Sequence, residues 1–195
     1  VWAPNLSGLY FPDAVEYLHL PPLDLSNAAD PTLSFRLWLS TAGGDGLSLE
    51  INTGSGWQPL PPDPPAYEGV VGGTVASWLS CGYIDEYCFT AVSLAPFVGS
   101  VVRVRLLFRS DWSSTAEGAY IADIGLNEES SDPDGDGING ILDEYLVHGS
   151  DPFLPVSDGD DINDGDEVTE SRDPLNPADW PGVTAITTGT LLDFE

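Results

Sequence analysis

The stretch Val101-Val-Arg-Val-Arg-Leu-Leu-Phe-Arg109 is the clearest sign of how the first part of this chain folds. In an extended strand the arginines at positions 103 and 105 lie on one face and the apolar residues between them on the other. The stretch Leu33-Ser-Phe-Arg-Leu-Trp-Leu39 alternates in the same way, with apolar side chains at the odd positions. Such alternation predicts β-strands that bury one face and expose the other to water.

Residues 1–127 repeat this pattern in short runs, which are separated by clusters of Gly, Pro, Asn and Asp. No window in this part of the sequence keeps a convincing helical period. Several short strands with long loops favour an all-β fold in which two sheets form a sandwich. The predicted strands are 16–20, 33–40, 47–52, 89–93, 101–110 and 119–124.

The charge of the chain is strongly one-sided. There are 32 acidic residues against five arginines and no lysine, and the formal net charge is -27. Such a surface repels nucleic acid and anionic membranes, because binding to either needs clustered Lys and Arg. No apolar run is long enough to span a bilayer. We therefore expect no nucleic-acid partner and no membrane insertion, and an affinity for divalent cations.

More than half of the acidic residues fall in residues 128–179, where Arg172 is the one basic residue. A solvated or disordered acidic segment is one interpretation of this run. The regular spacing of the acids favours another, a spacer with two calcium loops, because a hard cation requires about six to eight oxygen ligands. Without an ion, so many acids and so few apolar residues would not fold by burial alone. We place this spacer at 128–182.

The first acidic loop is Asp132-Pro-Asp-Gly-Asp-Gly-Ile-Asn139. In the spacing of an EF-hand loop, aspartates stand at positions 1, 3 and 5, a glycine at 6 and a carbonyl donor at 7. Position 12 falls on Asp143 and the next residue is Glu144, so the closing acid is ambiguous. A short helical turn is expected at 141–146. The candidate ligands of this loop are Asp132, Asp134, Asp136, the carbonyl of Ile138, Asp143 and Glu144.

The second loop, Asp158-Gly-Asp-Asp-Ile-Asn-Asp-Gly-Asp-Glu167, is aligned by its closing glutamate. Position 1 then falls on Val156, which cannot be a ligand, so this site is expected to be weaker or to be helped by Asp151. An Asp-Pro step follows each loop, at Asp151 and at Asp173, which makes an internal repeat. The candidate ligands here are Asp151, Asp158, Asp160, the carbonyl of Ile162, Asp164, Glu167 and Asp173.

Cys81 and Cys88 stand in the segment CGYIDEYC, with no cluster of His or Cys around them that would indicate zinc. A local disulfide is expected, and two unpaired buried thiols are the alternative. A disulfide implies an oxidising compartment, so we expect a secreted or extracellular protein at the cell surface.

Four aromatic residues in or near the loops have two interpretations. Flat rings exposed on a sandwich can form a platform that stacks on sugars, whereas rings that cover a sheet edge or fill the small core of a loop have no binding role. The candidates for a glycan platform are Trp57, Tyr67, Trp78 and Trp112.

Several motifs of the first part occur in a fixed order: Val1-Trp2, 5–10, 16–26, 33–38, 45–51, Gly56-Trp57, 101–111 and 118–124. In this order they resemble the MAM-like jelly-roll domain of bacterial secreted proteins, the type found beside immune-inhibitor-A metalloproteases. The resemblance covers residues 1–127 and implies a jelly-roll sandwich with an accessory or adhesive role. It also implies that Asp123 can lie near the acidic end of the first strand, where a cation can bridge them; a solvated strand end is the alternative.

That family's pattern opens with a strand that ends in Phe-Glu or Phe-Asp, before the Val-Trp motif. Here a similar segment, Thr187-Thr-Gly-Thr-Leu-Leu-Asp-Phe-Glu195, lies at the other end. We expect residues 183–195 to complete a neighbouring sandwich, either in a tandem array or between separate chains. The alternatives are that the segment folds back into its own sandwich or hangs free. The candidate donor residues are Leu191, Leu192, Asp193, Phe194 and Glu195.

With its Asp-Pro steps, the segment 132–179 resembles bacterial thrombospondin type 3 calcium repeats. The sequence contains no GxSxG or HExxH motif and no phosphate-binding glycine loop, so we expect no catalysis. The function predicted is an extracellular structural or adhesive unit, stiffened by Ca²⁺, that associates head to tail with copies of itself or adjacent repeats on a bacterial surface. The alternative is a module of a secreted hydrolase or protease that binds a cell-surface glycan or protein.

Overall fold

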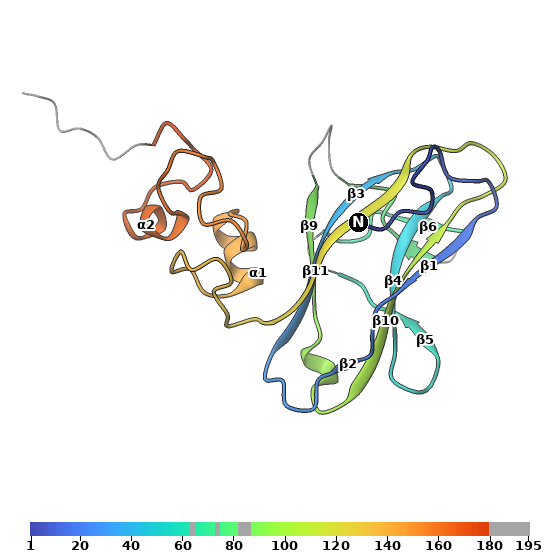
Figure 1. Cartoon of the computed structure of the whole chain (residues 1–195), viewed down its shortest axis with the longest axis horizontal. Coiled ribbons are helices and arrows are strands. Elements are labelled where there is room, and N and C mark those ends of the chain that lie inside the picture. Colours follow the sequence, from blue (N-terminus) through green and yellow to red (C-terminus); the bar gives the residue numbers. More distant parts are fainter. Residues whose placement is uncertain (63–64, 73–74, 82–86, 180–195) are drawn as a thin grey trace, which may run out of the picture. The chain divides into compact units, whose positions relative to one another are not determined.

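The computed structural model describes residues 1–62, 65–72, 75–81 and 87–179. The chain divides into two compact units, Val1–Ser131 and Asp132–Glu195. The first unit contains the described β-strands and the second contains short helices and loops (Figure 1). No helix in the described part of the chain is both long and apolar enough to cross a membrane.

The first sheet of the sandwich is antiparallel and has its longest strand, β10, at its centre. β10 pairs with β1 and β2 on one side and with β4 on the other, and β5 extends the sheet beyond β4. The strands are β1 (Val15–His19), β2 (Leu23–Asp24), β4 (Gly46–Asn52), β5 (Trp57–Pro59) and β10 (Val101–Arg109).

The second sheet is also antiparallel and is built around β3, which pairs with β11 on one side and with β8 and β9 on the other (Figure 1). A small hairpin of β6 and β7 is separate from it. The strands are β3 (Pro31–Ser40), β6 (Gly69–Val71), β7 (Val75–Ser77), β8 (Ser80–Cys81), β9 (Cys88–Ser93) and β11 (Gly118–Glu128), and a 3₁₀ turn spans Ala95–Phe97.

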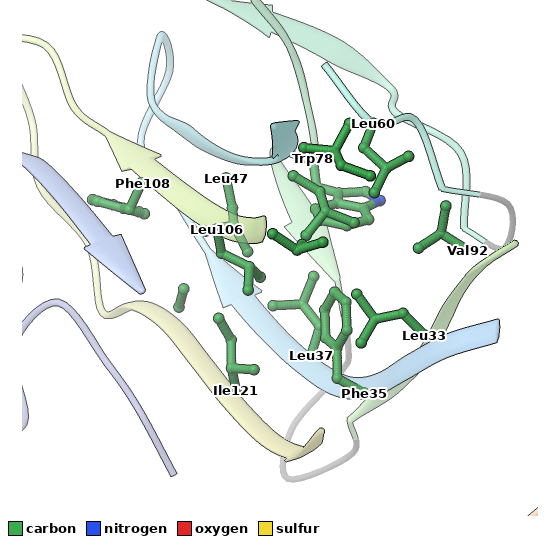
Figure 2. Close-up of a cluster of buried hydrophobic side chains, with 14 of the residues drawn as sticks. Leu33, Phe35, Leu37, Leu47, Leu60, Trp78, Val92, Leu106, Phe108 and Ile121 are labelled. Atoms are coloured by element: carbon green, nitrogen blue, oxygen red, sulfur yellow. The ribbon is translucent and has the colours of Figure 1, made fainter. Parts of the chain in front are cut away.

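Apolar side chains from both sheets meet in one core, which Figure 2 shows in close-up. The core side of β10 carries Val102, Val104 and Leu106, all fully buried, as its alternation predicts. β3 contributes the apolar residues at its odd positions. Trp78 fills the space against Phe35 with its ring centroid 6.1 Å from that of Phe35. This shared core makes the first unit a two-sheet sandwich.

The structure confirms the all-β fold and each of the six predicted strands. The prediction missed β2, β5, β6, β7 and β8, which are two or three residues long and are too short to show alternation. β11 also continues to Glu128, beyond its predicted end, past a bulge between Ala122 and Gly125. The jelly-roll connection stays a prediction.

The predicted disulfide is confirmed, since Cys81 and Cys88 are bonded with their Cα atoms 5.9 Å apart. It joins β8 to β9, two strands that both pair with β3.

The four aromatic candidates do not form one exposed platform. Trp78 is fully buried and donates a hydrogen bond from Nε1 to the carbonyl of Pro65 at 2.8 Å. Tyr67 packs on Trp78, with ring centroids 4.9 Å apart. Trp57 is half-buried and Trp112 is exposed. The glycan interpretation is therefore corrected for Trp78, because its ring belongs to the core and has no face open to a sugar. Tyr67 covers the core at this point by packing on Trp78.

The second unit contains two short helical regions. α1 (Ile141–Asp143) continues into a π-helical turn at Glu144–His148, and α2 (Asp164–Thr169) follows the second acidic loop. The helical turn predicted at 141–146 is present, with Ile141 fully buried and Leu146 exposed. α2 was not predicted.

Candidate metal centre

The first acidic loop folds around the side chains of three aspartates. Asp132 Oδ1 accepts a hydrogen bond from Gly135 N at 2.7 Å. Asp134 Oδ1 accepts one from Asp136 N at 3.2 Å, and Asp136 Oδ1 accepts one from Ile138 N at 2.7 Å. These side-chain turns curl the backbone and bring one oxygen of each aspartate within 4.8 Å of the others. The alternating spacing thus becomes a cluster of oxygens.

The second acidic loop repeats this construction. Asp158 Oδ1 accepts a hydrogen bond from Asp160 N at 3.1 Å, and Asp160 Oδ1 accepts one from Ile162 N at 2.8 Å. Oxygens of Asp158, Asp160 and Glu167 lie within 4.8 Å of one another. Two loops with similar sequence spacing therefore each form an acidic cluster.

The two loops differ at the residue that makes the bend. Gly137 takes a φ of 103° in the first loop, a conformation that glycine adopts without strain. The equivalent residue of the second loop is Asp161, with a φ of 74°. A residue with a Cβ is less stable in this left-handed region, although Asp tolerates it better than most. The second loop is thus the less favourable of the two.

A third cluster joins parts of both loops. Asp136 comes from the first loop, Glu144 begins the π-helical turn and Asp164 is the first residue of α2. One oxygen of each lies within 4.8 Å of the others. Their exposed fractions are 8%, 0% and 0%. The sequence assigned Asp164 to the second loop, whereas the structure groups it with two acids of the first repeat.

Carboxylates this close repel one another strongly when all are ionised. Two unit charges 4.8 Å apart repel by roughly 3.5 kcal/mol at an effective dielectric constant of ~20. Burial, followed by the charges of Asp134 and Asp136, raises the pKa of Glu144 from 4.5 to about 8. Burial likewise raises the pKa of Asp164 and, with the charges of its neighbours, that of Asp134 to about 6. A bound cation would remove this repulsion.

Several carboxylate oxygens of these clusters are buried without a hydrogen-bond donor among the described residues. A buried oxygen without a partner costs free energy, and a cation would supply the missing contact. Every candidate metal ligand in these clusters is an oxygen atom. Oxygen is the ligand type that Ca²⁺, Mg²⁺ and Mn²⁺ favour, more strongly than zinc does. The clusters can therefore hold a metal ion. The atoms concerned are Asp134 Oδ2, Glu144 Oε2, Asp158 Oδ2, Asp160 Oδ2 and both Oε atoms of Glu167.

An arginine partly compensates the charge of the second loop. Arg172 Nη1 lies 3.6 Å from Glu167 Oε1, and the two side chains are 10% and 0% exposed. Burial still raises the pKa of Glu167, which the positive charge of Arg172 opposes. Arg172 also pairs with Glu170, at 3.0 Å. The second loop therefore carries less uncompensated negative charge than the first.

The other predicted ligands have different positions. Asp143 is exposed and belongs to none of the clusters in the described residues, whereas Glu144 belongs to one, so Glu144 is the better closing acid. Asp151 and Asp173 each accept a hydrogen bond from the backbone N–H two residues ahead, at 3.2 and 3.1 Å. They cap the turns at the Asp-Pro steps.

Sequence spacing did not identify the serines that hold the acids in place. Ser150 Oγ donates to Glu144 Oε1 at 3.2 Å. Ser157 donates to Asp164 twice, from N at 2.9 Å and from Oγ at 2.6 Å. Ser150 and Ser157 are not part of the EF-hand pattern, and only their position shortly after or before an acidic loop was visible in the sequence.

The predicted donor residues 191–195 lie outside the described residues, and so do Asp193 and Glu195, the proposed partners of Asp123 in binding a cation. Asp123 itself lies in the bulge of β11 with a φ of 51° and forms an ion pair with Arg36 at 3.5 Å. Its side chain is largely exposed.

The fold and the clusters define an all-β sandwich followed by an acidic segment that can hold metal ions. No protein-family model matches this chain, and no curated protein compared with it matches either.

Proposed function

We propose that this chain is an extracellular structural or adhesive unit, stiffened by Ca²⁺, that joins head to tail with neighbouring copies by receiving an added β-strand. The open outer edge of β11 is the observation that carries this proposal. The acidic clusters support the calcium spacer, and the disulfide supports an oxidising location.

Among the described residues, β11 is paired along its length on one side only. β3 covers its inner side from Gly118 to Glu128. On its outer side, Trp2 exchanges two hydrogen bonds of 2.9 Å with Ile121, and the carbonyl of Glu128 accepts hydrogen bonds from Ser131 N at 3.0 Å and Ser131 Oγ at 2.6 Å. No other main-chain partner is found on this side among the described residues. Residues of β11 beyond the bulge therefore have main-chain groups that are open to a further strand. An unpaired edge of this kind is a template for strand addition.

The register of this edge follows from the pairs on the inner side. Glu129 N donates to Asp30 O at 2.7 Å, so position 129 faces β3. Because the main-chain N–H and C=O groups of successive residues point to alternate sides of a strand, those of Leu126 face the open side. Those of Glu128 face the same side, but its carbonyl is bonded to Ser131. Trp2 runs antiparallel to β11 at Ile121. A strand in the same direction as Trp2 would continue this pairing at Leu126.

A pocket of about 310 Å³ adjoins the same end of β11. Half of its lining is apolar and half is polar. The apolar residues are Leu25, Ala28, Pro31 and Leu126, and the polar residues are Asp24, Asn27, Asn127 and Glu128. Leu126 is 40% exposed. In strand addition, alternate side chains of the donor enter pockets of the acceptor, and this one has room for a large apolar side chain.

We propose the segment Leu191–Glu195 of a second copy as the donor. Its alternation would direct Leu192 and Phe194 to one face and the acidic residues to the other. An apolar face suits the pocket, and main-chain hydrogen bonds to β11 would supply affinity that does not depend on side chains.

The test is the association state of the whole chain in calcium, measured by sedimentation velocity over a range of concentrations. We expect head-to-tail oligomers for the intact chain and monomers after deletion of residues 191–195. The double substitution Leu192→Asp/Phe194→Asp should also give monomers, while Leu191→Asp, on the other face, should retain association. A monomeric intact chain whose residues 187–195 are protected from amide exchange would overturn the proposal.

A further inference from the structure

Asp164 lies in the second repeat, yet its carboxylate is grouped with acids of the first. The cluster of the second loop contains Asp158, Asp160 and Glu167 and does not include Asp164. An oxygen of Asp164 instead lies within 4.8 Å of oxygens of Asp136 and Glu144. The start of α2 therefore contributes a carboxylate to the neighbouring loop.

The two loops approach each other closely at this point. Gly165 N donates a hydrogen bond to Asp136 Oδ2 at 2.9 Å. A Cβ on Gly165 would lie 2.3 Å from the carbonyl oxygen of Asp136, which is too close for any side chain. Glycine is thus required for α2 to dock on the first loop. The contact fixes Asp164, the residue before it, beside Asp136.

Asp164 and Glu144 are both held in one orientation. Ser157 donates to both oxygens of Asp164, and Ser150 donates to Oε1 of Glu144. The second oxygen of Glu144 is different. Glu144 is 0% exposed, and its Oε2 has no hydrogen-bond donor among the described residues. A fully buried carboxylate oxygen without a donor, in a cluster with two further acids, is stabilised by a bound cation or, failing that, by a proton.

We infer that Asp136, Glu144 and Asp164 bind one divalent cation that joins the two loops. This inference rests on the proposed calcium spacer and adds a cross-loop ligand to it. The first residue of α2 thus supplies a ligand to the ion at the first loop. Cation binding at the first loop therefore also holds the second repeat in place. The spacer would then stiffen as one unit and not as two independent loops.

The structure provides a matched pair of variants in α2. Asp164→Asn removes a buried carboxylate of the cluster, and Asp166→Asn removes an exposed carboxylate of the same helix. Both change the net charge equally. We expect Asp164→Asn to lower the Ca²⁺ affinity of the tightest site by at least about tenfold, as loss of one charged ligand from a site of three acids requires. Asp166→Asn should change it less than about threefold.

Two further variants separate the role of Asp164 as a ligand from its role in the structure. Ser157→Ala removes one hydrogen bond that orients Asp164 and keeps the carboxylate, so its affinity should fall between the other two. Gly165→Ala keeps every carboxylate but blocks the docking of α2. We expect Gly165→Ala to lower the Ca²⁺ affinity as much as Asp164→Asn does. If Asp164 acted only within its own loop, Gly165→Ala would not have this effect.

The experiment is calorimetric titration of the full chain with Ca²⁺, paired with amide exchange of the peptide that contains α2. Full protection of α2 in the wild type, lost in Asp164→Asn and Gly165→Ala but not in Asp166→Asn, is the expected result. Equal affinities of Asp164→Asn and Asp166→Asn would overturn the cross-loop site while leaving calcium binding intact. Absence of any Ca²⁺ binding to the wild type would instead refute the proposed spacer itself.

Discussion

The two units of this chain are stabilised by opposite kinds of residue. In the sandwich the buried side chains are mostly apolar, and the sheets satisfy the backbone. In the described part of the acidic unit, Ile138 and Ile141 are the buried aliphatic side chains, while Asp136, Glu144 and Glu167 are buried as well. Burial of apolar surface can stabilise the first unit without help. The second buries acids instead, so we expect its stability to depend on a bound cation.

The largest effect that tests this comparison is removal of calcium. In excess chelator at neutral pH, we expect amide protection of residues 132–179 to fall by orders of magnitude, because the acids then repel one another. Protection of the strands of the sandwich should stay within a few-fold. Amide exchange followed peptide by peptide measures both in one sample. Equal loss of protection in the two units would contradict the comparison.

A large substitution in the sandwich core should act in the opposite way. Trp78→Ala deletes a fully buried ring and its hydrogen bond to Pro65, and should lower the free energy of unfolding of the sandwich by roughly 3–5 kcal/mol. The cost should be the same with calcium and with chelator. Urea unfolding of the sandwich in both conditions gives the measurement.

Trp112→Ala is the matched control, because Trp112 is 79% exposed. Its effect should stay within about 0.5 kcal/mol. A similar cost for both tryptophans would contradict the role of burial in the sandwich. A cost for Trp78→Ala that depends on calcium would show that the two units are not stabilised independently.

The sandwich was more predictable from sequence than the site because alternation is a local signal. The arginines at 103 and 105 mark the face of β10 opposite Val102, Val104 and Leu106, and the structure buries those three. The burial of Trp78 could not be predicted from a local signal. This residue lies in a segment with very short strands, and its burial depends on Phe35 and Tyr67, which are distant in the sequence.

The acidic segment divides in the same way. The turns within each loop follow from Asp at alternating positions, because each side chain bonds to the backbone a few residues ahead. The grouping of Asp164 with Asp136 and Glu144 depends on the docking of α2 through Gly165, a contact between segments 29 residues apart. Spacing within one loop carries no information about such a contact, so it could not predict the grouping of Asp164 with Asp136 and Glu144.

The third effect concerns pH and has opposite signs with and without calcium. The pKa of Glu144 is raised from 4.5 to about 8 in the folded unit without metal, mainly by burial. The folded form thus holds a proton that the unfolded form releases. In chelator, the protection of the acidic unit should be greatest below pH 4.5 and fall as the pH rises to 8, by up to about tenfold per pH unit. With calcium, which needs the ionised carboxylate, protection should rise over the same range.

Amide exchange of residues 132–179 at pH 5 and pH 8, corrected for the intrinsic effect of pH on exchange, distinguishes these signs. Glu144→Gln keeps the shape of the protonated carboxyl and cannot ionise, so in chelator it should flatten the pH dependence. Glu170→Gln is the control, because Glu170 is exposed and lies outside the clusters found in the described residues. Two outcomes would contradict this role of the buried Glu144 carboxyl. One is amide protection in chelator that rises with pH, and the other is a pH dependence that Glu170→Gln flattens as much as Glu144→Gln does.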